Sequence, residues 1–272
     1  MGKLDVTKAI EQAPNRRSFV RKLGIASAAV GAGFAIDMKD AKAATTTDVN
    51  VVNFALNLEY LEAEFYTVAT TGKTLEQSGF DVGPNPGPTF GGAKVNFSNN
   101  LVFSSTAALQ IADDERAHVK LLRGLLGSAA IHKPAINLNA LGFGYANQND
   151  FLKLARIFED IGVTAYAGAA PLLSPPVLAY AARILAAEAE HAANIRLQIA
   201  RLNVATSKLD SVDIIPPPSG VELFSLDNNG LAATRTPAQV LYLAYGAGNV
   251  TSGGFFPDGA NGYFTKSSAS PA

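Results

Sequence analysis

Two stretches of the chain share one pattern: residues 111–122 read IADDERAHVKLL and residues 184–195 read ILAAEAEHAANI. Both stretches hold a glutamate and a histidine three residues apart, Glu115 with His118 and Glu188 with His191. On an α-helix such a pair lies on one side, one turn apart, and isoleucine or leucine continues that side in both directions. Each stretch therefore predicts a helix that carries a carboxylate and an imidazole into the core of a helix bundle, where they can bind a metal ion.

A single buried histidine is more often an ordinary core residue than a metal ligand. Here two of the three histidines lie in matching apolar frames, which favours the ligand interpretation. The third, His132, precedes Lys133 and Pro134 in a predicted loop, and we do not expect it to bind metal. The chain has no cysteine, which excludes disulfides, thiolate metal sites and cysteine nucleophiles. A metal would be held by oxygen and imidazole nitrogen, a donor set that suits iron or manganese better than structural zinc.

The first 43 residues have the order of regions that is typical of an export signal peptide. A basic segment around Arg16 and Arg17 leads into a mildly apolar run over 23–36, and residues 41–43 (Ala-Lys-Ala) match a small-x-small cleavage pattern. The paired arginines followed by Ser-Phe-Val resemble a twin-arginine signal, which predicts a periplasmic or otherwise exported protein. A retained membrane anchor is the alternative. Because the apolar run is short and glycine-rich, we predict no stable membrane span after cleavage.

Charge and length bound the mature protein. Residues 1–43 hold eight of the 22 basic and four of the 23 acidic residues, so the remainder carries a net charge of −5. That charge argues against nucleic acid or an anionic membrane as the partner. We predict a bundle over 44–205 and a C-terminal extension over 206–272, with no second folded domain.

Helical periodicity marks four long segments and one short one. They cover 48–70, 100–126, 150–170, 175–202 and, as the short one, 236–245. The first is expected to begin with Thr47 or Asp48 as its N-cap. Residues 71–99 and 127–149 are long links, whereas residues 171–176 form a tight turn.

The long helices repeat in pairs. Ala55, Glu59, Tyr66 and Ala69 recur exactly one hundred residues later as Ala155, Glu159, Tyr166 and Ala169, and the Glu-x-x-His frames recur 73 residues apart. The chain therefore reads as two helical hairpins, each with a Glu-plus-Tyr helix followed by a Glu-plus-His helix. Such hairpins are expected to pack about a pseudo-twofold axis that brings the polar core residues together.

These features resemble the ferritin-like superfamily, an all-α fold in which a long crossover joins two helical hairpins of a four-helix bundle. Residues 127–149 would be that crossover. The text of residues 53–62, 235–241 and 254–257 is similar to exported ferritin-like domain proteins, a group that includes plant desiccation-related proteins. The resemblance spans about 48–265 and implies a four-helix bundle followed by an irregular tail with a short fifth helix.

The resemblance also implies a set of ligands for two divalent metal ions, iron or manganese. The ligands would be Glu59, Glu115, His118, Glu159, Glu188 and His191, with Glu115 and Glu188 as bridges. Tyr66 and Tyr166 would hydrogen-bond metal carboxylates of the neighbouring hairpin, as similarly spaced tyrosines do in rubrerythrin-like members. Simple packing of the two rings is the alternative.

Glu62 leaves an ambiguity. It lies one turn from Glu59 on the same face, and its duplicate position is Gly162. It could be an extra carboxylate that moves onto a metal, or it could replace Glu59, which we favour. Asp113 and Asp114 are expected at the surface or beside a ligand. Glu64 and Glu190 point away from the ligand faces and are expected in solvent.

Two functions of different classes fit these residues. The first is an exported di-metal oxidoreductase that acts on hydrogen peroxide or dioxygen in stress protection. The second is a non-enzymatic metal-binding or structural protein that protects the envelope against stress or drying. Cage-type iron storage is disfavoured by the long loops and tail. A homodimer through helical faces is left open.

Overall fold

The computed structural model describes residues 44–98, 105–224 and 226–272. The predicted export signal at 1–43 and the first residues of the predicted second helix, 100–104, lie outside the described residues. Within the described part, no helix is long and apolar enough to cross a membrane.

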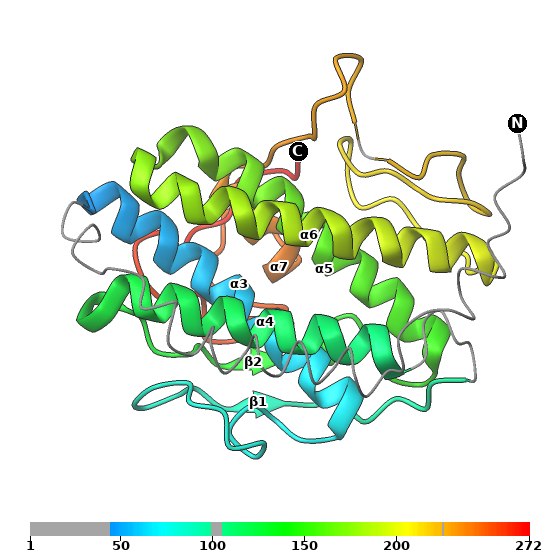
Figure 1. Ribbon diagram of the computed structural model, residues 1–272, viewed down its shortest axis with the longest axis horizontal. Coiled ribbons are helices and arrows are strands. Elements are labelled where there is room, and N and C mark those ends of the chain that lie inside the picture. The colour runs from blue at the N-terminus through cyan, green and yellow to red at the C-terminus, as the bar shows by residue number, and fades with distance from the viewer. Residues whose placement is uncertain (1–43, 99–104, 225) are drawn as a thin grey trace, which may run out of the picture. The chain divides into compact units, whose positions relative to one another are not determined.

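Four long helices form two antiparallel hairpins (Figure 1). They are α3 (Thr46–Thr71), α4 (Ser105–Leu126), α5 (Gln148–Ala169) and α6 (Pro175–Arg201). The first hairpin packs α3 on α4 and the second packs α5 on α6, and α3 also contacts α5. Apart from the start of α4, whose predicted first residues lie outside the described part, the ends of these helices lie within two residues of those predicted. The all-α four-helix bundle is therefore confirmed.

The start of α3 differs from the prediction. Thr45, not Thr47 or Asp48, is the N-cap, and Asp48 is the third residue of a capping box. The Thr45 side chain accepts a hydrogen bond from the Asp48 amide at 3.1 Å, and the Asp48 carboxylate accepts one from the Thr45 amide at 2.7 Å. The same carboxylate accepts a bond at 2.8 Å from the amide of Ser174, the N-cap of α6, so Asp48 ties together the starts of two bundle helices.

The two long links lie side by side. β1 (Thr89–Phe90) in the first link pairs in parallel with β2 (Ile136–Asn137) in the crossover, with Thr89 opposite Ile136. The crossover starts in a 3-10 turn, η2 (Gly127–Ala129), and runs back to the N-cap of α5 at Asn147. The sequence did not predict this short pairing, because two residues carry too little periodicity to mark a strand.

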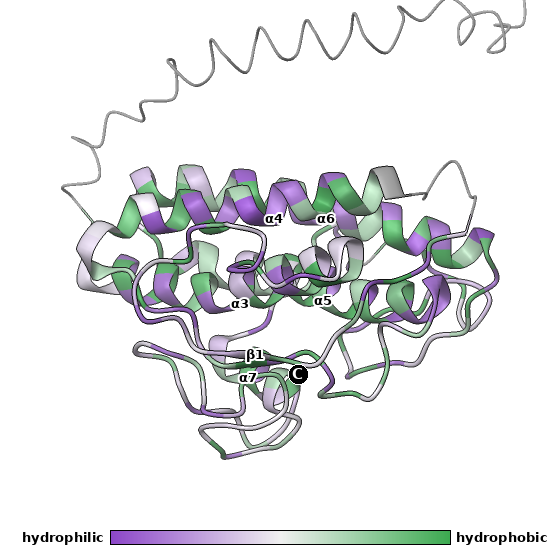
Figure 2. Ribbon diagram, turned by 90° about the horizontal axis from the view of Figure 1, so that it is seen from below, coloured by the Kyte–Doolittle hydropathy of each residue, from purple (hydrophilic) through white to green (hydrophobic). Residues whose placement is uncertain are grey.

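The C-terminal extension covers the bundle with one short helix and irregular chain. The short helix is α7 (Pro237–Tyr245), which packs against α5. Within the bundle, a second 3-10 turn, η3 (Ala170–Leu172), makes the tight connection from α5 to α6. Figure 2 shows α4 and α6 in one layer and α3 and α5 in the next, with β1 and α7 on the far side of that second layer. Because α3 lies between the layer of α4 and α6 on one side and β1 and α7 on the other, every residue from Val51 to Ala69 except Ala55 is buried.

Candidate metal centre

Six carboxylate and imidazole side chains meet in the middle of the bundle. They come from all four long helices: Glu59 from α3, Glu115 and His118 from α4, Glu159 from α5, and Glu188 and His191 from α6. All six are buried. They form two groups, each of four side chains with one donor atom apiece within 4.8 Å of the others, and Glu115 and Glu188 belong to both groups.

The first group is centred on His118. Its Nδ1 lies 3.1 Å from Glu59 Oε2, 3.3 Å from Glu115 Oε2 and 3.5 Å from Glu188 Oε1. The three carboxylates belong to three different helices, so tertiary packing rather than local sequence brings them to one nitrogen. The helical periodicity places His118 and Glu115 together, but only the bundle adds the other two.

The second group is centred on His191 and mirrors the first. Its Nδ1 lies 3.1 Å from Glu115 Oε1 and 3.3 Å from Glu159 Oε2. The Nε2 atom lies 3.3 Å from Asp114 Oδ2, so a surface carboxylate holds the outer edge of the ring. A carboxylate behind a ligating histidine fixes its orientation and raises its basicity. In the other hairpin, the position that matches Asp114 is Ala187.

The two tyrosines make the expected hydrogen bonds across the hairpins. The Tyr66 hydroxyl on α3 donates to Glu159 Oε1 on α5, and the Tyr166 hydroxyl on α5 donates to Glu59 Oε1 on α3. Each bond holds one oxygen of its carboxylate and leaves the other directed at a histidine. Burial, and then the nearby Glu159 carboxylate, raises the pKa of Tyr66 well above its usual value, so the hydroxyl keeps its proton.

The donor set leaves buried acceptors that a cation would satisfy. Among the described residues, the buried atoms without a well-aligned hydrogen-bond donor include Glu115 Oε1, Glu159 Oε2 and both carboxylate oxygens of Glu188, although all but Glu188 Oε2 lie 3.1–3.5 Å from a histidine Nδ1. Buried acceptors left without partners are rare in proteins because each costs about 1–3 kcal/mol. These atoms all belong to the two groups, and oxygen with imidazole nitrogen is a suitable donor set for divalent iron or manganese. The residues therefore fit a pair of metal ions.

The electrostatics of the metal-free site also favour the binding of cations. Burial, and then the neighbouring Glu115 carboxylate, raises the pKa of Glu188 well above its ordinary value. Burial alone would lower the pKa of His118, but the Glu59 carboxylate and the hydrogen bond to Glu115 outweigh it and raise that pKa to about 12. Without cations the carboxylates must therefore share protons, with each other and with the imidazoles.

Comparison with known proteins assigns the fold to a family. Residues 47–201, more than half of the chain, match the sequence model of the family described as ferritin-like domain. The chain belongs to the ferritin-like domain family. It is 23% identical over 281 residues to the ferritin-like catalase Nec2 of Nesocodon mauritianus, with 85% of this chain and 89% of that protein covered. It is 28% identical over 247 residues to the desiccation-related protein PCC13-62 of Craterostigma plantagineum, with 72% of this chain and 76% of that protein covered.

Glu62 of this ferritin-like protein lies beside the centre but in neither group of the described residues. It is buried, with 5% of its surface exposed. A β-carbon added at Gly162 would lie 2.5 Å from Glu188 Oε2 and 3.4 Å from Glu62 Oε1, so the missing side chain leaves room for both carboxylates. Of the two candidates on α3, Glu59 is the one that lies beside a histidine, with its Oε2 atom 3.1 Å from His118 Nδ1.

The expectation for Glu64 was wrong. Glu64 is fully buried, and its carboxylate accepts a hydrogen bond from Lys133 Nζ at 2.9 Å and from the Thr89 hydroxyl at 2.7 Å. Lys133 also lies 3.1 Å from Glu76. Helical periodicity places Glu64 opposite the ligand face, but in this family member that second face of α3 is covered by the two long links. Sequence reasoning missed Lys133, whose only local signal was its position beside a proline.

The other polar residues lie as expected. Asp113, Asp114 and Glu190 are exposed. His132 is in an exposed loop, where its Nδ1 lies 2.7 Å from the Pro84 carbonyl oxygen, and it belongs to neither group of the described residues.

Proposed function

We propose that this ferritin-like protein is an oxidoreductase that holds two ions of iron or manganese and acts on hydrogen peroxide or dioxygen. The observation that carries the proposal is the overlap of the two ligand groups. Because Glu115 and Glu188 belong to both, two ions held by these groups would be adjacent and bridged. The relative named a ferritin-like catalase supports peroxide as the substrate.

Each ion would have its own terminal ligands. Glu59 and His118 would complete the first position, and Glu159 and His191 the second. Two adjacent redox-active ions would supply or accept the two electrons that separate peroxide from water or from dioxygen.

The chain itself would position and shield the centre. Tyr66 and Tyr166 are positioning residues, since each donates to the outer oxygen of a terminal carboxylate and keeps its inner oxygen on the metal side. Asp114 would hold the His191 ring through Nε2. Both histidines are about nine-tenths buried, so bulk water has little access and the polar groups act in a medium of low dielectric constant.

The test compares two glutamates of α6 that lie two residues apart. Protein purified from its own compartment should contain two iron or manganese ions per chain and release dioxygen from hydrogen peroxide. Glu188→Gln should lose both ions, because Glu188 belongs to both groups, and should lose turnover with them. Glu190→Gln, which is exposed, is the matched control and should keep both. Full turnover by metal-free protein would refute the proposal.

A non-enzymatic role is the second candidate, and the relative named a desiccation-related protein favours it. In this case the same residues would bind metal for storage or for stability, and metal-loaded protein would leave hydrogen peroxide unchanged. Metal content and peroxide turnover, measured on one preparation, therefore separate the two functions.

We also propose export through the twin-arginine pathway. The support is the sequence of residues 16–43. That pathway carries folded proteins, so a metal centre filled in the cytoplasm would be compatible with it.

A further inference from the structure

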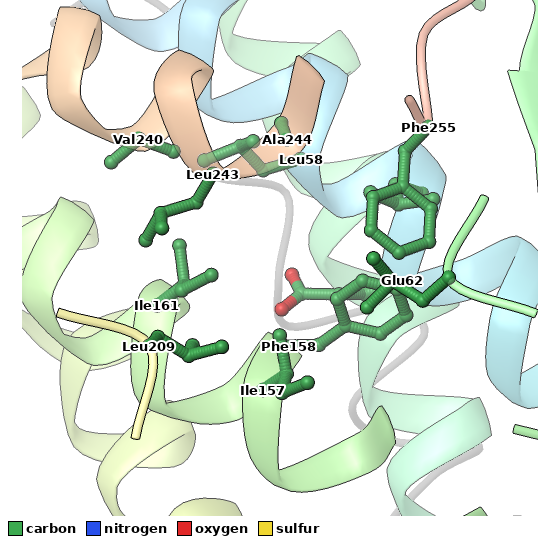
Figure 3. Close-up of a pocket in the computed structure, with 13 residues that line it drawn as sticks. Leu58, Glu62, Ile157, Phe158, Ile161, Leu209, Val240, Leu243, Ala244 and Phe255 are labelled. Atoms are coloured by element: carbon green, nitrogen blue, oxygen red, sulfur yellow. The ribbon is translucent and has the colours of Figure 1, made fainter. Parts of the chain in front are cut away.

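An apolar cavity of about 80 Å³ lies between α3, α5 and α7, beside the candidate metal centre (Figure 3). Its inner wall is formed by residues of the bundle such as Leu58 and Phe158, and its outer wall by Leu209, Leu243 and Phe255 of the C-terminal extension. Those outer residues follow residue 201, where the match to the family model ends. The extension therefore builds a compartment that the bundle helices do not enclose by themselves.

One polar side chain faces this cavity. Glu62 is the single charged or hydrogen-bonding side chain among the residues that line it. Figure 3 shows the Glu62 carboxylate projecting into the space between Ile161, Leu209 and Phe158. The residue is more than nine-tenths buried, and within the described part of the chain no hydrogen bond reaches its carboxylate, which faces the cavity.

The contrast with the other core glutamates is informative. Glu59 and Glu159 each accept a tyrosine hydroxyl and lie beside a histidine, whereas Glu62 has neither. Because Gly162 has no side chain, the space between Glu62 and Glu188 stays open. A buried acceptor without a partner costs free energy unless something from outside supplies a donor.

We infer that the cavity is a binding site for a short-chain alcohol, with the hydroxyl group on Glu62 and the alkyl chain among the leucine, isoleucine and phenylalanine side chains. A hydroxyl group both donates and accepts, so it can pair with the carboxyl group in either protonation state. A carboxylate ligand would bring a second negative charge into the apolar space beside Glu62, at a much larger desolvation penalty.

The size of the cavity limits the ligand. An apolar cavity of about 150 Å³ takes a benzene ring, so a space of roughly half that volume takes about three to five non-hydrogen atoms. Propanol and n-butanol fit this limit. A longer chain would have to extend through the mouth, where Leu141 is exposed. The inference concerns binding and does not depend on which reaction the metal centre performs.

The first experiment measures binding of an alcohol series to the full-length protein by calorimetry, with metal content determined on the same sample. Affinity should rise about fourfold per methylene from ethanol to n-butanol, as expected for burial of one methylene group, and then level off. Butyrate should bind at least tenfold more weakly than n-butanol. No dependence on chain length, or a preference for butylammonium, would overturn the inference.

Variants locate the site. Leu243→Trp should fill the cavity and weaken n-butanol binding at least tenfold, while Leu109→Trp, on the partly exposed surface of α4, should leave it unchanged. Glu62→Leu should weaken binding about tenfold through loss of the hydrogen bond, and Glu62→Gln, which keeps an acceptor and a donor, should restore most of it.

A crystallographic soak gives a readout that does not depend on stability. Crystals soaked in bromopropanol should show anomalous bromine density inside the cavity and the hydroxyl oxygen within hydrogen-bond distance of Glu62. Bromine density elsewhere only, together with unchanged affinity in Leu243→Trp, would assign the binding to another surface and overturn the inference.

Discussion

Removal of metal should lower the thermal stability of this protein by a large and calculable amount. The two ligand groups define two positions, and without cations their carboxylates repel one another in a buried core. An ion present at a thousand times its dissociation constant stabilises the native state by about 4 kcal/mol, so two ions give roughly 8 kcal/mol. In a domain of this size each kcal/mol shifts the melting temperature by about 2–4 °C, which predicts a difference of roughly 15–30 °C between loaded and chelated protein.

Single substitutions divide this effect between the two positions. His118→Ala removes a ligand from the first group only, and His191→Ala removes one from the second group only. Each variant should keep at most one tightly bound ion and lose about half of the stabilisation by metal. His132→Ala is the control, because that imidazole lies in an exposed loop beside the Pro84 carbonyl oxygen.

Scanning calorimetry with and without chelator, together with elemental analysis, provides the measurement. The reasoning fails if protein with two bound ions melts at the same temperature as chelated protein. It also fails if His132→Ala loses as much metal as His118→Ala, since the two groups would then not be the binding site.

Three further outcomes are expected. The melting temperature of metal-free protein should fall as pH rises from about 5 to about 8. Burial and neighbouring carboxylates raise the pKa of Glu188, so the folded chain keeps a proton that the unfolded chain releases. The melting temperature of metal-loaded protein should instead rise with pH, because metal binding needs ionised carboxylates and neutral imidazoles. Lys133→Met should lower the free energy of unfolding in urea by about 3 kcal/mol, since it leaves Glu64 buried without its cation, and a change near zero would show that Glu64 simply takes up a proton. Replacing Arg16 and Arg17 by lysine should leave precursor in the cytoplasm in a fractionation experiment, and normal export would point to another route.

The helices and the composition of the polar core could be predicted from local sequence patterns. A period of about 3.6 residues places Glu115 with His118, and Glu188 with His191, on single helix faces whatever surrounds them. The repeat that relates Glu59 to Glu159 indicated two similar hairpins, and the described helices agree with this prediction. Local signals were sufficient because helix ends and helix faces depend on residues only a few positions apart.

The segments that cover each helix face, in contrast, depend on tertiary packing. Glu64 was expected in solvent, yet the link that carries β1 and the crossover that carries Lys133 bury it, and no local pattern records the arrival of segments so distant in sequence. The choice between Glu59 and Glu62 likewise depends on how α3 packs against α4, which brings Glu59 and not Glu62 to His118. Periodicity fixes the direction in which a side chain leaves its helix, whereas its surroundings are set by packing between elements far apart in the chain.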